Sequence, residues 1–136
     1  ERLAFAVAEG VRQDGEVELI CKTASQANAS DLIDSDGLLI GSPENLGYMA
    51  GAIKDFFDRT YYAVQPLQLS LPYGLFVSAG NDGAGAVREI DRILSGYPMK
   101  KVVDPIVCKG EVDSAALAKC RELGQAFGAG LAMGLL

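Results

Sequence analysis

Histidine is absent from the 136-residue sequence, and tryptophan is absent as well. Without histidine the chain lacks the commonest general base, the usual serine-hydrolase triad and the ligands of most zinc sites. We therefore assign no catalytic residue and no metal ligand. If the chain supports catalysis, we expect a cofactor to carry the chemistry.

Cysteine is scarce, and Cys21, Cys108 and Cys120 show no CxxC spacing. An odd number of cysteines without a visible secretory segment argues against a disulfide framework and predicts a reducing, cytoplasmic compartment. Long apolar runs are also lacking. The longest, Ala126–Leu136, is about half of the ~20 residues that span a bilayer, so we expect no membrane association.

Positive charge is in the minority. The chain has 12 basic and 18 acidic residues, and its net charge is −6. Such a surface repels phosphate backbones, which makes nucleic acid an unexpected partner. With 49% hydrophobic and 22% charged residues, the composition is that of one ordinary globular domain spanning residues 1–136.

Helical and strand-like patterns alternate along the whole chain. Apolar residues at helical spacing predict helices at Leu3–Val11, Ser30–Ile33, Tyr48–Tyr62, Val87–Leu94 and Ser114–Leu135. Strand-like runs occur at Glu16–Lys22, Gly37–Ile40, Leu75–Val77 and Val102–Cys108. Alternation of this kind predicts an α/β domain with a parallel sheet and helices on both faces.

The strand patterns differ in a way that places them in the sheet. Glu16–Lys22 alternates between apolar and charged residues, and Val102–Cys108 contains Pro105, so both are typical of edge strands. Gly37–Ile40 and Leu75–Val77 are continuously apolar, as expected of central strands that are covered on both faces.

Each central strand is followed by a loop rich in glycine and polar residues. Ligands of open α/β sheets bind beyond the carboxyl ends of the strands. The candidate binding residues are therefore Ser42, Pro43, Glu44, Asn45, Leu46, Gly47 and Tyr48 in the first loop, and Ser78, Ala79, Gly80, Asn81, Asp82 and Gly83 in the second.

The segment GSPENLGYMAGAIKDFFDRTYY, residues 41–62, resembles a motif of flavodoxin-fold FMN proteins, G-S/T-P-x-x-x-G-x-x-x-G-x-x-K-x-x-x-D. The matching positions are Gly41, Ser42, Pro43, Gly47, Gly51, Lys54 and Asp58. The motif is shared by NADPH-dependent FMN reductases and by tryptophan-repressor-binding-protein-like NAD(P)H:quinone oxidoreductases. The resemblance implies a flavodoxin-like, three-layer, doubly wound parallel sheet of strand order 2-1-3-4-5.

That order places a first strand between Glu16–Lys22 and Gly37–Ile40, yet the chain begins with a helical pattern. We therefore expect strand 1 and the phosphate loop that follows it to be missing from this chain and to lie upstream of Glu1.

The resemblance also implies a function. The first loop would lie along the isoalloxazine ring of FMN, and the second would donate backbone amides to its pyrimidine edge. The implied activity is electron transfer from NAD(P)H to a quinone or similar acceptor. Two alternatives stay open, a flavodoxin-type electron carrier and a non-catalytic binding or regulatory protein that retains the fold. A homodimer or tetramer is expected.

Structural interpretations of the same residues remain. Gly41–Pro43 fits a simple strand-to-helix turn, and Asn81–Gly85 fits a turn with a helix cap. Lys54, Asp58 and Arg59 fit a solvated helix face or a subunit contact. Four glycines in the last helix, at positions 124, 128, 130 and 134, predict close packing, either on the sheet or against a second subunit.

Overall fold

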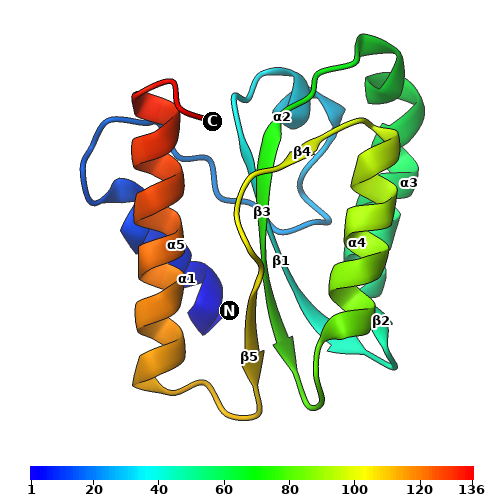
Figure 1. The fold of residues 1–136 in the computed structure, drawn as a ribbon. Coiled ribbons are helices and arrows are strands. Elements are labelled where there is room, and N and C mark those ends of the chain that lie inside the picture. Colours follow the sequence, from blue (N-terminus) through cyan, green and yellow to red (C-terminus); the bar gives the residue numbers. More distant parts are fainter.

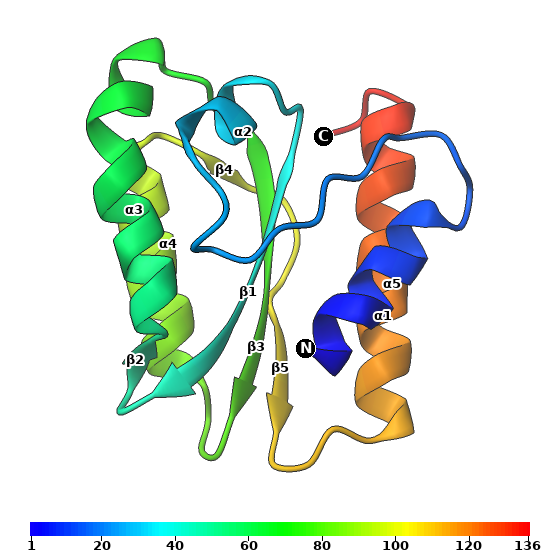
Figure 2. The ribbon, with the colours of Figure 1, turned by 180° about the vertical axis from the view of Figure 1, so that it is seen from behind.

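The computed structural model describes all residues from Glu1 to Leu136. Its helices are α1 (Arg2–Arg12), α2 (Ala29–Ile33), α3 (Gly51–Val64), α4 (Ala84–Gly96) and α5 (Ser114–Ala132), with a 3₁₀ turn η1 (Gln65–Leu67). Its strands are β1 (Leu38–Asn45), β2 (Tyr48–Met49), β3 (Pro72–Ala79), β4 (Lys100–Lys101) and β5 (Ile106–Lys109). Figures 1 and 2 show three layers, with α1 and α5 on one face of the sheet and α3 and α4 on the other.

Strand β3 is the centre of the sheet. It pairs in parallel with β1 on one side, where Leu75 lies opposite Ile40, and with β4 and β5 on the other, where Val77 lies opposite Val107. Leu75 and Val77 are completely buried. The predicted α/β architecture is thus confirmed, and the continuous apolar run at Leu75–Val77 is explained by cover on both faces.

The predicted strand Val102–Cys108 is split into two short pieces. β4 ends at Lys101 and β5 begins at Ile106, and both pair with β3. Pro105 immediately precedes β5; it has no N–H to donate to a ladder, and its ring fixes φ. The edge position predicted for this part of the chain is correct, because β5 has β3 as its single strand neighbour.

The strand predicted at Glu16–Lys22 is wrong. These residues form no helix or strand. Their alternation still has a structural consequence, since Val17 and Leu19 are half-buried against the α1–α5 side of the core while Ile20 and Cys21 are exposed. The segment fails to become a strand because no other strand pairs with its backbone.

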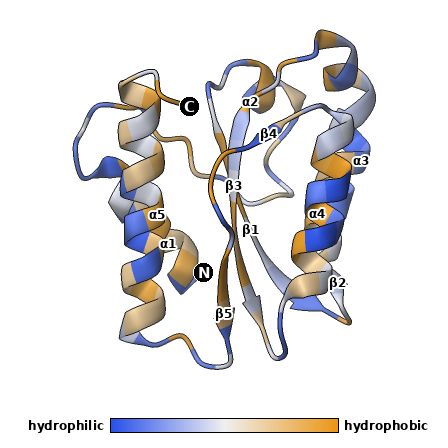
Figure 3. Ribbon diagram, viewed as in Figure 1, coloured by the Kyte–Doolittle hydropathy of each residue, from blue (hydrophilic) through white to orange (hydrophobic).

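The hydrophobic core has a larger part between the sheet and helices α3 and α4 and a smaller part under α1 and α5. Figure 3 shows the corresponding division along α4, which is hydrophilic on one side and hydrophobic on the other. Tyr97 is completely buried in the larger part. Its hydroxyl donates to the carbonyl of Phe57 at 2.9 Å and lies 2.8 Å from the hydroxyl of Thr60.

Helices α1 and α5 approach each other closely at small residues. A Cβ atom added to Gly124 would lie 2.1 Å from the carbonyl oxygen of Val7, and one added to Gly10 would lie 2.0 Å from the carbonyl oxygen of Arg121. The glycines at the middle of α5 therefore pack against α1. Gly124 thus contacts α1 rather than the sheet.

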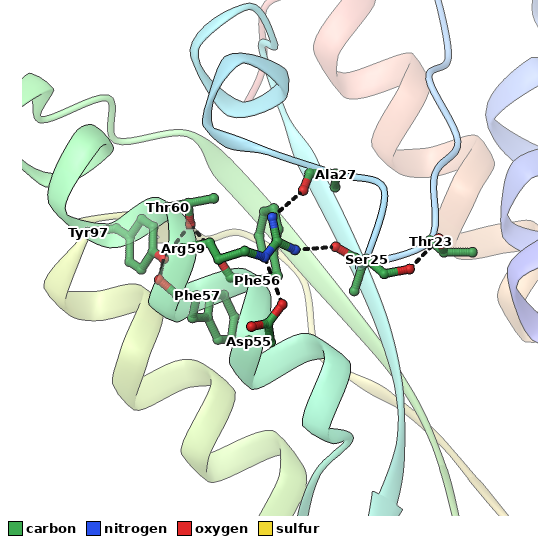
Figure 4. A network of polar contacts seen from close by, with 10 residues as sticks. Thr23, Ser25, Ala27, Asp55, Phe56, Phe57, Arg59, Thr60 and Tyr97 are labelled. Atoms are coloured by element: carbon green, nitrogen blue, oxygen red, sulfur yellow. Dashed lines mark hydrogen bonds and ion pairs between the residues drawn. The ribbon is translucent and has the colours of Figure 1, made fainter.

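Arg59 attaches the segment before α2 to helix α3, as Figure 4 shows. Its guanidinium donates to the carbonyls of Ala24 at 2.8 Å and Ala27 at 2.9 Å, and it pairs with Asp55 one turn away. Lys54 pairs with Asp58 on the exposed surface of the same helix. On α3, Lys54 and Asp58 thus form a solvent-exposed ion pair, whereas Arg59 holds another segment of the chain against the helix.

Candidate functional site

The first candidate loop is a β-hairpin. β1 continues through the motif to Asn45, which pairs with Tyr48, and Glu44 pairs with Met49. The intervening turn residues, Leu46 and Gly47, both have positive φ, 53° and 75°, as a two-residue type I′ hairpin turn requires. The sequence-based boundaries at Gly41–Gly47 for a loop and Tyr48 for the start of a helix are therefore wrong, and α3 begins at Gly51.

Ser42, in β1, is hydrogen-bonded to the residue that precedes α3. Its side chain is buried, and its hydroxyl accepts a hydrogen bond of 2.9 Å from the backbone N–H of Ala50 and donates one of 2.7 Å to the carbonyl of Pro43. Both hydrogen-bond partners of the hydroxyl are backbone groups of the protein, so this side chain positions the hairpin.

Glu44 connects the hairpin to helix α4. Its carboxylate accepts a hydrogen bond of 3.1 Å from the backbone N–H of Ala86, which lies in the first turn of α4. Gly85 lies next to the hairpin turn, because a Cβ atom at this position would be 2.0 Å from the carbonyl oxygen of Gly47. The hairpin is thus in direct contact with the first turn of α4, which follows the second candidate loop.

The second candidate loop presents unpaired backbone donors. The amides of Gly80, Asn81, Asp82 and Gly83 donate to no protein acceptor. Gly80, Asn81 and Asp82 are exposed, and the Asp82 carboxylate accepts from the N–H of Ala84 at 3.0 Å, which caps its own turn. Gly83 has φ +69° and is buried. A run of free N–H groups is an arrangement that binds acceptor atoms of a ligand.

The strand register brings the two loops to one edge of the sheet. Ser42 lies opposite Val77, and Pro43 lies opposite Ser78, at the carboxyl ends of β1 and β3. Ala79 is buried, Tyr48 is half-buried, and Leu46 is fully exposed at the tip of the hairpin. The predicted residues therefore lie at the carboxyl edge of the sheet, where α/β sheets bind ligands.

Sequence reasoning missed the two residues of α4 that meet the hairpin, Gly85 and Ala86. Gly85 belongs to the glycine-rich run that was interpreted as a turn, but its partner, Gly47, lies 38 positions earlier in the chain. No local pattern reports such a contact.

No group of three or more His, Cys, Asp or Glu side chains lies close enough together to hold a metal ion. None of the helices combines the length and the hydropathy needed to cross a lipid bilayer.

No family model matches the chain. A stretch of 58 residues, 43% of the chain and 31% of the relative, is 38% identical to "Flavodoxin" of Aquifex aeolicus (strain VF5). A stretch of 57 residues, 40% of the chain and 27% of the relative, is 39% identical to "Quinone-oxidoreductase QR2" of Triphysaria versicolor.

Solved structures match over nearly the whole chain. The flavodiiron core of Flv1 from Synechocystis sp. PCC6803 superimposes with a TM-score of 0.80 at 25% identity, covering 97% of this chain and 32% of that one. A flavodoxin from the domain Archaea superimposes with a TM-score of 0.75 at 21% identity, covering 94% and 87%. The chain has a flavodoxin-like fold.

The flavodoxin-like chain spans less than a third of the length of the curated relatives that it matches. Its fold is therefore established over nearly all of its residues, whereas the sequence match to named relatives covers less than half of them. The named relatives include a flavodoxin, a quinone oxidoreductase and a probable NAD(P)H dehydrogenase (quinone).

Proposed function

We propose that the chain is the flavin-binding domain of an FMN-dependent oxidoreductase that passes electrons from NAD(P)H to a quinone or similar acceptor. The observation that best supports this proposal is the row of unpaired backbone amides at Gly80–Gly83, at the same edge of the sheet as the hairpin turn at Leu46–Gly47. The names of two curated relatives, a quinone oxidoreductase and a probable NAD(P)H dehydrogenase (quinone), support the choice of acceptor and reductant.

The residues present fit a flavin. A flavin has carbonyl and ring-nitrogen acceptors along its pyrimidine edge, and the amides of Gly80, Asn81 and Asp82 are free to donate to them. The exposed side chain of Leu46 and the half-buried ring of Tyr48 offer apolar cover for a flat ring. When bound, the flavin supplies hydride and single-electron chemistry.

The protein contributes position and electrostatics. Backbone N–H groups of the Gly80–Gly83 loop would stabilise negative charge on the pyrimidine edge of a bound flavin, because donors that the fold already holds in place need little reorientation. Ser42 and Glu44 act indirectly, since their hydrogen bonds to Ala50 and Ala86 hold the hairpin against α3 and α4. The loop that would hold the phosphate is not assigned among these residues.

A second candidate is a flavodoxin-type electron carrier, and the match to the Aquifex flavodoxin favours it. The two functions differ in reactivity toward NAD(P)H. The test is to titrate the purified protein with FMN while following flavin fluorescence and the visible spectrum, and then to add NADH or NADPH without oxygen. Bleaching followed by reoxidation with benzoquinone supports the reductase, and bound flavin that neither nucleotide bleaches supports the carrier.

The loop amides can be tested separately from activity. Asn81→Pro removes one of the unpaired N–H groups, whereas the matched control Asn81→Ala removes the side chain and keeps the N–H. We expect about a fivefold weaker FMN affinity for the proline variant and little change for the alanine variant, because one hydrogen bond is worth about 1 kcal/mol. Absence of FMN binding by the unaltered protein would contradict both candidates and favour a non-catalytic binding protein.

A further inference from the structure

The dipeptide Asp-Gly occurs at three places in the chain, Asp14–Gly15, Asp36–Gly37 and Asp82–Gly83. Such a pair has an intrinsic reactivity, because the nitrogen of the following residue can attack the aspartate carboxyl carbon and glycine has no side chain to shield that nitrogen. In a folded protein the reaction has two local requirements. The glycine N–H must be free of a hydrogen bond, and the aspartate side chain must fold toward the main chain that follows it.

Asp82–Gly83 meets both requirements. The N–H of Gly83 donates to no protein acceptor. The Asp82 carboxylate accepts a hydrogen bond of 3.0 Å from the N–H of Ala84, two residues further along the chain, so its side chain is turned toward the main chain that follows it. Asp82 is also exposed, which gives water access to the carboxyl group. The turn thus holds a carboxyl group beside a peptide nitrogen that is free to react.

The other two pairs each fail a requirement. The N–H of Gly15 donates to the carbonyl of Arg12 at 3.1 Å, and this hydrogen bond has to break before the nitrogen reacts. The carboxylate of Asp36 accepts no hydrogen bond, so nothing holds its side chain toward Gly37. The sequence offers three equivalent pairs, and the fold distinguishes one of them.

We propose that Asp82–Gly83 is a modification site at which aspartate converts spontaneously to isoaspartate. The Gly83 nitrogen forms a bond to the side-chain carboxyl carbon of Asp82, and its proton leaves with the carboxyl OH as water, which closes a cyclic imide. Water then opens the imide. Cleavage at the former main-chain carbonyl makes the chain run through the side-chain carbon as isoaspartate, and cleavage at the side-chain carbonyl restores aspartate. The conversion consumes no oxidant and no cofactor.

Isoaspartate at this position changes the loop in two ways. It inserts a methylene group into the main chain before Gly83, where space is short, because a Cβ atom on Gly83 would lie 2.7 Å from the side chain of Val107. It also moves the carboxylate from the side chain to the Cα atom, so the N–H of Ala84 loses its acceptor. We therefore expect the amides of Gly80–Gly83 to be displaced. Weaker FMN binding follows, a consequence that rests on the proposed function.

The test follows isoaspartate at the Asp-Gly pairs of the flavin-free protein during long incubation at physiological temperature. Peptide mapping by mass spectrometry measures it, together with an endoprotease that cleaves before aspartate but not before isoaspartate. We expect conversion about fivefold faster at Asp82 than at Asp14, because the reaction at Asp14 first breaks a hydrogen bond worth about 1 kcal/mol. Conversion at Asp36 should also be slower than at Asp82. An equal or slower rate at Asp82 than at either other site overturns the proposal.

Unfolding provides the control for local sequence. In concentrated urea the hydrogen bonds of Gly15 and Ala84 are absent, so the Asp-Gly pairs should react at similar rates. A lead of Asp82 that persists in urea overturns the assignment to the folded turn. Asp82→Glu keeps a carboxylate but has to close a larger ring, so conversion there should stop. The matched control Asp14→Glu should leave the rate at Asp82 unchanged.

FMN affinity is measured separately, on fresh protein and on the isoaspartate form isolated by ion-exchange chromatography. We expect about fivefold weaker FMN binding by the isoaspartate form, which corresponds to the loss of about one hydrogen bond. Equal affinity of the two forms overturns the consequence for the binding loop. Absence of FMN binding by fresh protein contradicts the proposed function alone, because the rates in the flavin-free protein decide whether Asp82 is the modification site.

Discussion

The carboxylate of Glu44, at the end of β1, accepts a hydrogen bond from the backbone N–H of Ala86 in the first turn of α4, 42 residues further along the chain. The first N–H groups of a helix have no intrahelical acceptor, and the helix dipole favours negative charge at that end. Glu44 thereby caps a helix to which it does not belong. The orientation of the hairpin relative to α4 consequently depends on a side chain as well as on the backbone.

Replacement of Glu44 by alanine is expected to lower the free energy of unfolding by about 1 kcal/mol, because an amide of α4 loses its acceptor. Glu44→Gln keeps an acceptor oxygen and loses only the charge, so we expect about half of that effect. Urea unfolding at pH 7 measures both, with Glu122→Ala on the exposed face of α5 as control. Equal stability of the alanine variant and the unaltered protein would show that the cap is unimportant.

Gly85 and Gly51 both lie in the first turns of helices but have different surroundings. A Cβ at Gly85 would lie 2.0 Å from the carbonyl oxygen of Gly47, whereas nothing lies within 4 Å of one at Gly51. We expect Gly85→Ala to destabilise the protein by about 1–3 kcal/mol through overpacking and to weaken FMN binding. Gly51→Ala should be neutral or stabilising by up to about 1 kcal/mol. Thermal unfolding and FMN titration of the two variants provide the comparison.

Packing of α1 on α5 allows a similar test away from the candidate site. Gly124→Ala brings a Cβ to 2.1 Å from the carbonyl of Val7, while at Gly128 the nearest atom, the carbonyl oxygen of Val11, is 3.3 Å away. We expect Gly124→Ala to cost about 1–3 kcal/mol of stability and Gly128→Ala much less. FMN affinity should be unchanged in both variants, which separates this helix contact from the loops. The opposite ranking in chemical unfolding would contradict the observed helix crossing.

Tyr97 makes stability sensitive to alkaline pH. Burial raises the pKa of its phenol above the ordinary value of 10.0. The unfolded chain therefore releases this proton first, and the contribution to stability, complete below pH 10, falls as the pH rises from 10 toward the folded pKa. At pH 7, Tyr97→Phe should lower the free energy of unfolding by about 1 kcal/mol, because the hydrogen bonds of the hydroxyl are lost. Between pH 7 and pH 11, the variant should lose less stability than the unaltered protein does.

Urea titrations at the two pH values measure this difference. Tyr62→Phe, at an exposed position of α3, is the control and should behave as the unaltered protein. Burial also raises the pKa of Tyr73, so the alkaline loss should shrink in Tyr97→Phe without disappearing. An identical pH dependence of Tyr97→Phe and the unaltered protein would contradict the assignment.

The sequence predicted correctly those elements whose signal lies in a few neighbouring residues. Leu75-Phe76-Val77 predicted a central strand because burial on both faces leaves a continuous apolar run. The last helix begins at Ser114 as predicted, because a cap is local chemistry: the Asp113 carboxylate accepts a hydrogen bond of 2.9 Å from the N–H of Ala116. Glu16–Lys22 showed the pattern of a strand but had no strand to pair with.

The hairpin after β1 escaped prediction for a different reason. Pro43 and the polar residues beside it are typical of a loop, and the two-residue turn uses Leu46 at a positive φ, a position that leucine rarely occupies. The contact of Gly47 with Gly85 and the cap that Glu44 provides for α4 depend on how two distant segments meet. Such relationships are set by the tertiary fold.

Every parallel ladder of the sheet includes β3, which pairs with β1, β4 and β5, while none of these three pairs in parallel with another. Opening of β3 would therefore disconnect all of them at once, leaving no smaller parallel sheet behind. The amides of Leu75 and Val77 should exchange only through global unfolding, and the sheet should unfold as a single cooperative unit. Because β1 and β3 lie more than 30 residues apart in sequence, that unit assembles only after a long loop has closed, which sets a limit on the folding rate.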